Sequence, residues 1–104
     1  MYLKIQSDCI TFRVSQAEAQ QLLNTGEIKD SITLNPLNQI QYMVKTTNNN
    51  AELLFDFGSQ LKFTLCVNKQ VLESEVKDRP SKQGIKITSS TAISAFLEID
   101  LKSK

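Results

Sequence analysis

Two acidic residues near the end of the chain have the spacing that comes nearest to a chemical site. Glu98 and Asp100 lie two positions apart in a segment whose alternating pattern predicts a strand, so their carboxylates project from one face. Such a pair could bind a cation or a small ligand, and Arg13 could join it if its own strand lies beside the last one. The commoner alternative is an exposed polar face with a surface ion pair. We keep Arg13, Glu98 and Asp100 as the candidate binding residues.

The rest of the chain lacks the side chains that most catalytic sites need. It has no histidine among its 104 residues, which removes the usual general base at neutral pH, the Ser-His and Cys-His nucleophile systems and the commonest metal ligand. Its three glycines are isolated, so they cannot build a phosphate-binding loop. We expect no catalytic residue, no metal site and no cofactor, and we favour a non-enzymatic role over an enzymatic one.

Charge and hydropathy narrow the classes of partner. The formal net charge is +1 and the basic residues are dispersed, so we expect neither a nucleic acid nor a membrane as partner. No stretch approaches the roughly 20 apolar residues of a membrane span, and the N-terminus lacks the apolar core of a signal peptide. Cys9 and Cys66 have no metal-ligand spacing and are interpreted as packing residues. These features predict a cytoplasmic protein with reduced thiols.

The best-specified local structure is a strand that runs directly into a helix. Apolar and polar residues alternate over residues 10–14, which is the pattern of a strand with one buried face. Ser15 and Glu18 then form a capping box, because the serine hydroxyl can accept from a helical N–H while the carboxylate accepts from the Ser15 N–H. Gly26 lies where a left-handed helix end is expected. The sequence predicts a helix from residue 16 to about residue 25.

The same order of elements is predicted twice along the chain. Asn68 is the expected cap of a second helix over about residues 69–77. Alternating segments predict eight strands, at residues 2–6, 10–14, about 28–34, 39–45, 53–57, 61–67, 85–87 and 93–101. Residues 1–104 thus form one domain built from two ββαββ units, at about residues 1–46 and 51–102.

A single numerical offset relates the two units. Adding 53 to a position in the first unit superimposes the caps, since Ser15 falls on Asn68. The same offset places apolar strand residues on one another: Ile10, Phe12 and Val14 on Phe63, Leu65 and Val67; Ile32 and Leu34 on Ile85 and Ile87; Ile40, Tyr42 and Val44 on Ile93, Ala95 and Leu97. This correspondence predicts a pseudo-two-fold axis.

Eight mainly antiparallel strands could form a strongly curled sheet, a barrel, or two sheets packed together. The faces opposite the main apolar rows are mostly polar but carry Met43, Leu54 and Phe96, so part of these faces must be covered. We predict an α+β fold with a barrel-like or strongly curled sheet and two short helices packed outside it or at its ends. The alternative is a sheet with both helices on one side and a homodimer burying the other.

The two ends of the chain resemble an uncharacterised bacterial family of proteins of about one hundred residues, known only as a domain of unknown function. Members begin K-I-x-I-x-G-N-S-I-R-x-R-L-T-x-x-E-V and end near V-E-K-D-F. The resemblance rests on five residues of this chain, namely Arg13, Ser15, Glu18, Glu98 and Asp100. Ser7 and Asp8 stand where the family has its Gly-Asn turn, Thr11 replaces the first arginine and Ile99 replaces the lysine. The resemblance implies a shared fold and size, and it implies no activity.

Three functional interpretations follow. We favour a non-enzymatic binding or interaction domain, acting as a homodimer or with another protein, with Met43, Leu54 and Phe96 as its interaction surface. The alternative is a metal- or small-ligand-binding domain that uses Glu98 and Asp100. A minor third is a phosphohydrolase similar to the triphosphate-tunnel enzymes. Those enzymes line a channel with charged residues, whereas this chain places apolar residues in the corresponding rows and has no E-x-E-x-K near its start.

Overall fold

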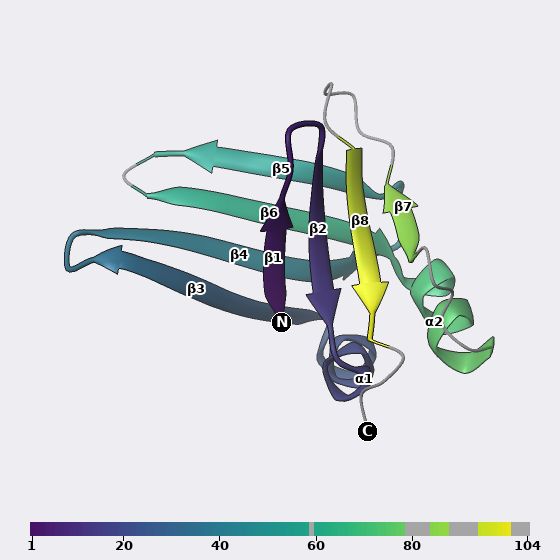
Figure 1. Cartoon of the computed structure of the whole chain (residues 1–104). Coiled ribbons are helices and arrows are strands. Elements are labelled where there is room, and N and C mark those ends of the chain that lie inside the picture. The colour runs from purple at the N-terminus through teal and green to yellow at the C-terminus, as the bar shows by residue number, and fades with distance from the viewer. Residues whose placement is uncertain (59, 79–83, 88–93, 101–104) are drawn as a thin grey trace.

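The computed structural model describes all residues except 59, 79–83, 88–93 and 101–104 (Figure 1). It contains eight strands and two helices in the predicted order: β1 (Tyr2–Ile5), β2 (Cys9–Val14), α1 (Gln16–Thr25), β3 (Glu27–Asn35), β4 (Asn38–Thr47), β5 (Glu52–Phe57), β6 (Leu61–Asn68), α2 (Lys69–Asp78), β7 (Ile85–Ile87) and β8 (Ser94–Ile99). The fourth strand continues to Thr47, two residues beyond its predicted end. The predicted turn at residues 89–91, the loop at residues 79–82 and the strand positions Ile93 and Leu101 lie outside the described residues.

The strands form two four-stranded sheets, which we call sheet A (order β1-β2-β8-β7) and sheet B (order β3-β4-β6-β5). Within each sheet the two outer pairs are antiparallel and the central pair is parallel. The predicted barrel-like or strongly curled sheet is therefore wrong. Each helix connects a strand of one sheet to a strand of the other. The hairpin before a helix and the hairpin after it therefore belong to different sheets. Each sheet instead buries one apolar face against the other sheet, and their strands cross at a steep angle (Figure 1).

The two ββαββ units are interchangeable in this topology, because exchanging them turns sheet A into sheet B. Each sheet combines the first hairpin of one unit with the second hairpin of the other. The register of the central parallel pairs agrees with the offset of 53, since Phe12 lies opposite Leu97 and its counterpart Leu65 lies opposite Val44. The α+β class and the repeated unit are thus confirmed.

The offset fails at the third strand of each unit. In sheet A, Ile85 lies opposite Leu97. The offset equates Leu97 with Val44, and in sheet B Val44 lies opposite Ile28. The structural counterpart of Ile85 is therefore Ile28. The assignment of residues 32–34 as equivalents of residues 85–87 is therefore wrong, because β3 begins its pairing four residues earlier than the offset requires. Residues 32–34 belong to an extension of the β3/β4 hairpin that has no counterpart in β7.

Both helix starts follow from the sequence. The Glu18 N–H donates to the Ser15 hydroxyl at 3.0 Å, and the Ser15 N–H donates to the Glu18 carboxylate at 3.0 Å, which completes the predicted capping box. The Asn68 side chain accepts from the N–H of Gln70 at 2.9 Å and of Val71 at 3.2 Å. The two helices lie side by side at one end of the molecule, beside the inter-sheet core (Figure 1).

Sheet B extends beyond sheet A because both of its hairpins are longer. Eleven residues (31–41) separate the opposed residues Asp30 and Tyr42, whereas seven (88–94) separate the equivalent pair Ile87 and Ala95. Likewise, seven residues (56–62) lie between the opposed Phe55 and Phe63, against four (6–9) in the β1/β2 hairpin. The extra length forms the part of sheet B that projects past β1 on the left of Figure 1.

Candidate functional site

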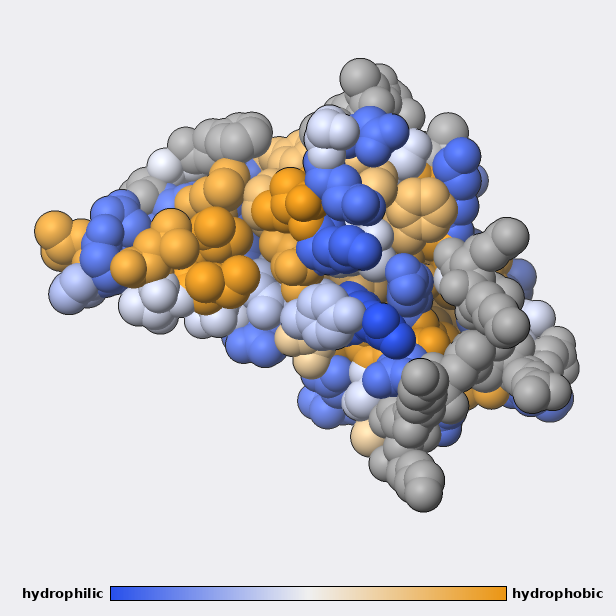
Figure 2. All heavy atoms as spheres, viewed as in Figure 1, coloured by the Kyte–Doolittle hydropathy of each residue, from blue (hydrophilic) through white to orange (hydrophobic). Residues whose placement is uncertain are grey.

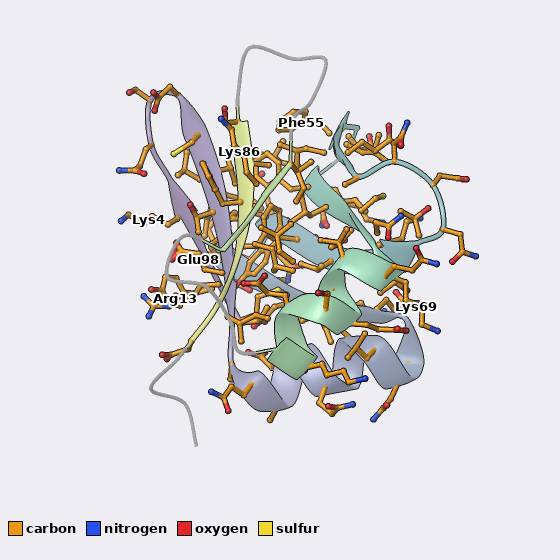
Figure 3. All side chains as sticks on the ribbon, turned by 90° about the vertical axis from the view of Figure 1, so that its right-hand side faces the viewer. Lys4, Arg13, Phe55, Lys69, Lys86 and Glu98 are labelled. Atoms are coloured by element: carbon orange, nitrogen blue, oxygen red, sulfur yellow. The ribbon has the colours of Figure 1, made fainter. Side chains whose placement is uncertain are left out.

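The predicted binding residues Arg13, Glu98 and Asp100 come together on the outer face of sheet A. Arg13 lies opposite Glu98 in the parallel β2/β8 pair, and its guanidinium is 3.5 Å from the Asp100 carboxylate. It also donates a hydrogen bond of 3.1 Å to the Tyr2 hydroxyl and lies 5.9 Å from the centre of the Tyr2 ring. Figure 3 shows Arg13 and Glu98 on the side of sheet A that faces away from sheet B. The proximity that the sequence suggested is present.

The contacts of this group are those of a surface ion pair. The hydrogen bond to Tyr2 raises the pKa of Arg13, and the Asp100 and Glu98 charges act in the same direction. Both side chains of the Arg13–Asp100 pair are more than one-third exposed, so solvent screens their attraction. Within the described part of the chain, no three histidine, cysteine or acidic side chains lie together as metal ligands would. The arrangement does not favour the metal-binding alternative.

The predicted interaction residues Met43, Leu54 and Phe96 do not form one surface. Met43 and Leu54 flank Thr64 on the outer face of sheet B, where they lie opposite it from either side. Phe96 lies opposite Thr11 on the outer face of sheet A. Both threonines are buried, and the three apolar residues beside them lie on two separate outer faces. Of the three, only Leu54 is among the exposed large hydrophobic residues, at 43%.

The two cysteines differ in environment. Cys66 is buried on the outer face of sheet B, and this burial raises the pKa of its thiol, which keeps the sulfur protonated and unreactive at neutral pH. Cys9 is half-buried and its thiol donates to the side-chain oxygen of Gln6 at 3.1 Å. Both thiols are free.

A shallow hollow of about 550 Å³ lies on the outer face of sheet B. The side chains that share this face alternate along their strands and include Lys29, Ser31, Gln41 and Lys62. Glu27 and Asp30 also line the hollow, so its two lysines are matched by two carboxylates. A mixed, open surface of this kind orients no ligand by itself.

A second polar group lies where the N-terminus meets α1. The Met1 amine donates to both Glu18 oxygens, at 2.8 and 2.6 Å, and the same carboxylate closes the helix cap. Burial alone raises the pKa of Glu18, but these hydrogen bonds outweigh it and lower the pKa. Burial also raises the pKa of the nearby Tyr42 phenol, and the Asp30 and Glu18 charges add to that shift. These contacts fasten β1 to α1 and are structural.

The extension of sheet B carries the main exposed apolar surface. On its inner face the apolar rows of β4 and β6 continue past the edge of sheet A, whereas the row of β3 has the exposed Asp30 between Ile28 and Ile32. We call the four apolar residues Ile32, Leu34, Ile40 and Leu61 the overhang. Leu34 is 61% exposed and Ile32 is 39% exposed, whereas Ile40 and Leu61 are partly buried against the core. Figure 2 shows apolar side chains gathered over this part of sheet B.

A hollow at the end of the overhang gives it a defined shape. The hollow has a volume of about 400 Å³ and combines three overhang residues with an uncharged rim of amide side chains and one glycine: Leu34, Ile40 and Leu61 with Asn35, Asn38, Gln39, Gln60 and Gly58. Ile5 of β1 is 57% exposed and ends the strand of sheet A nearest to the overhang (Figure 1). The overhang is thus an apolar surface that lies beside β1, an edge strand of sheet A.

The sequence pattern alone misses this surface. Ile32, Leu34 and Ile40 alternate with polar residues in the same way as the core residues of the neighbouring strands, so alternation assigns them to the interior. The available signal was the unequal length of the hairpins. A chain with matched units but longer sheet-B hairpins must leave the tips of those hairpins uncovered.

Comparison with known proteins identifies one family. The model of a family of unknown function, DUF7009, matches residues 1–103 of the chain. No curated protein and no solved structure matches the chain. In the described residues, no helix combines the length and the hydropathy that crossing a bilayer requires.

Proposed function

The chain belongs to this family of unknown function, and on that premise we propose that it is a non-enzymatic interaction module that binds another protein through the overhang. The observation that carries the proposal is the run of apolar side chains on the inner face of sheet B beyond the edge of sheet A. We expect the module to act in the cytoplasm, where its two free thiols would stay reduced.

The energetics of the overhang support a role other than stability. Full burial of a leucine or isoleucine side chain contributes about 1.5–3 kcal/mol, and Leu34 and Ile32 leave much of this unrealised because they are 61% and 39% exposed. The sheets already bury complete rows of apolar residues without them. A partner that covers the overhang would recover the missing burial, which favours an interaction surface.

The form of the surface supports a protein partner. An apolar centre with a polar rim is the usual composition of a protein–protein interface, in which charged residues are depleted from the core. The amide groups of Asn35, Asn38 and Gln60 can donate and accept hydrogen bonds at the rim without the desolvation cost of a charge.

The proposal is tested by affinity capture followed by reconstitution. The bait is the wild-type chain, the double variant Ile32→Ser/Leu34→Ser, or the control variant Leu54→Ser, which removes a comparably exposed leucine from the opposite face of the same sheet. A protein captured from extracts of the source cells is then purified and its affinity for each bait is measured. We expect wild type and Leu54→Ser to bind alike and the double variant to lose at least about tenfold in affinity. Equal binding by all three baits would refute the overhang as the site.

A further inference from the structure

We infer that the partner is an extended segment of another protein that adds as a strand to the free edge of β1 and lays its apolar side chains on the overhang. The inference rests on the proposed function, because it uses the same surface, and it specifies what occupies that surface. Two observations support it, namely the unpaired edge of β1 and the exposed apolar surface of the overhang beside that edge.

The free edge of β1 presents the backbone groups of Leu3 and Ile5. Among the described strands β1 pairs with β2 only. The Gln6 N–H donates to the Cys9 carbonyl at 2.9 Å, so this opposed pair is hydrogen-bonded. Hydrogen-bonded and non-bonded pairs alternate in an antiparallel ladder, so Lys4 also bonds to β2 whereas Leu3 and Ile5 point their N–H and C=O groups away from it. An added strand would find two donors and two acceptors at this edge.

The overhang lies where the side chains of an added strand would land. Both apolar residues of β1 lie on the inner face of sheet A. Leu3 is packed against the core, whereas Ile5 is half-exposed and leaves apolar surface uncovered. A strand placed next to β1 alternates its side chains between the two faces of sheet A. Those on the inner face would cover Ile32, Ile40 and Leu61, much as sheet A covers the adjoining rows of sheet B. The segment therefore carries large apolar side chains at alternate positions.

Charge indicates the residue between those apolar positions. Lys4 lies on the outer face of β1 and makes no ion pair with any described residue. Figure 3 shows it projecting from sheet A on the side away from sheet B. Opposite charges on directly opposed residues of neighbouring strands stabilise the pair. The expected ligand is an extended segment with alternating apolar residues and an aspartate or glutamate opposite Lys4.

The other sheet edges are less suited to strand addition. β3 carries a register irregularity between Thr33 and Asn35 together with the charged Lys29 and Asp30, and such features protect an edge from pairing. β5 begins at Glu52 and carries Asp56, and β7 has only three residues. β1 has a single charge, a regular register with β2 and the overhang beside it.

A second copy of the chain fits this groove less well than an extended segment. A copy whose β1 paired antiparallel with β1, with both apolar faces on the same side, would bring its own sheet B into the space that the overhang already fills. Two overhangs packed face to face would bury roughly a few hundred Å² per copy. A stable dimer needs about 800 Å² per copy. An extended segment adds main-chain hydrogen bonds to the same apolar contact.

The test begins with a displayed library of random short peptides selected on the full chain. We expect enrichment of peptides in which apolar residues alternate with polar ones and an acidic residue occupies an intervening position. Enrichment of helix-spaced apolar residues, or no enrichment, would overturn the inference.

The selected peptide is then synthesised and its affinity measured for wild type, Ile5→Pro and Ile5→Ala. Proline removes the outward N–H at an edge position where it disturbs no bond to β2, and alanine keeps that N–H while removing the same side chain.

We expect Ile5→Pro to bind at least about tenfold more weakly than Ile5→Ala. In wild type, the Leu3 and Ile5 amides should exchange with solvent more slowly once the peptide is bound. This measurement needs no variant and covers the case in which Ile5→Pro fails to fold.

The double variant Ile32→Ser/Leu34→Ser separates the two proposals. If it loses the peptide while the proline and alanine variants bind alike and the amides stay unprotected, strand addition is wrong and the overhang remains the site. If the double variant also binds normally, the proposed function fails as well. Self-association of wild type that the double variant abolishes would assign the surface to a second copy and overturn the inference.

Discussion

Truncating Leu34 and Leu65 to alanine should have very different effects on stability, although both leucines face the inner side of sheet B. Leu65 is fully buried between the sheets, and removing a buried leucine side chain costs about 2–5 kcal/mol. Leu34 is 61% exposed, so less than half of the roughly 1.5–3 kcal/mol available from full burial is realised there. We expect Leu34→Ala to cost about 1 kcal/mol or less.

The assay is urea unfolding followed by circular dichroism, with thermal unfolding as a second probe. For a domain of this size, about 1 kcal/mol shifts the midpoint temperature by roughly 4–8 °C. Leu34→Ala should therefore lower Tm by a few degrees, and Leu65→Ala by roughly 8–40 °C if it still folds. Equal losses for the two variants would mean that the overhang is buried in the free chain, and they would refute the claim that it is an unpartnered surface.

The other predictions concern positions that hold the fold together. Gly26→Ala and Gly84→Ala both place alanine at a positive φ, of 91° and 73°, and should each cost about 1–2 kcal/mol for that reason. Gly84→Ala should cost at least about 1 kcal/mol more, because its Cβ would lie 2.5 Å from the Leu97 carbonyl oxygen, and equal urea midpoints for the two variants would contradict this contact. Ser15→Ala and Asn68→Ala each remove the side chain that caps a helix and should each lower the free energy of unfolding by about 1 kcal/mol, whereas a loss at only one of them would show that the two caps are not equivalent. The pKa of Glu18 is lowered on folding, so its carboxylate stabilises the chain above its ordinary value of 4.5, and this contribution is lost as the pH falls through the lower folded value. Wild type should therefore lose more stability than Glu18→Gln between neutral pH and pH values below 4.5, and parallel pH profiles of the urea midpoint would count against the Met1–Glu18 contact.

The sequence predicted the elements well because their signals are local. The strand that runs into α1 is fixed by alternation and by a capping box whose two residues lie three positions apart, and both are present in the structure. The contact between Arg13 and Asp100 could be anticipated only as a condition, because it depends on which strands become neighbours. That condition is met when β2 and β8 pair in parallel.

The division into two sheets was beyond the reach of the sequence pattern. Alternation tells which face of a strand is apolar but does not tell which strand lies beside it, so one curled sheet and two packed sheets have the same pattern. The overhang was missed for a related reason. Ile32 and Leu34 carry the pattern of buried residues, and their exposure depends on where the other sheet ends.

Site-specific photocrosslinking in the source cells tests the central claim most directly, because it asks where a partner touches the chain. The photoreactive residue p-benzoylphenylalanine replaces Leu34 in the overhang or, as the control, Leu54 on the opposite face of sheet B, which is exposed to a similar degree. We predict a discrete crosslinked protein from position 34 and none from position 54. A crosslink from position 54 alone, or none from position 34, would contradict the account.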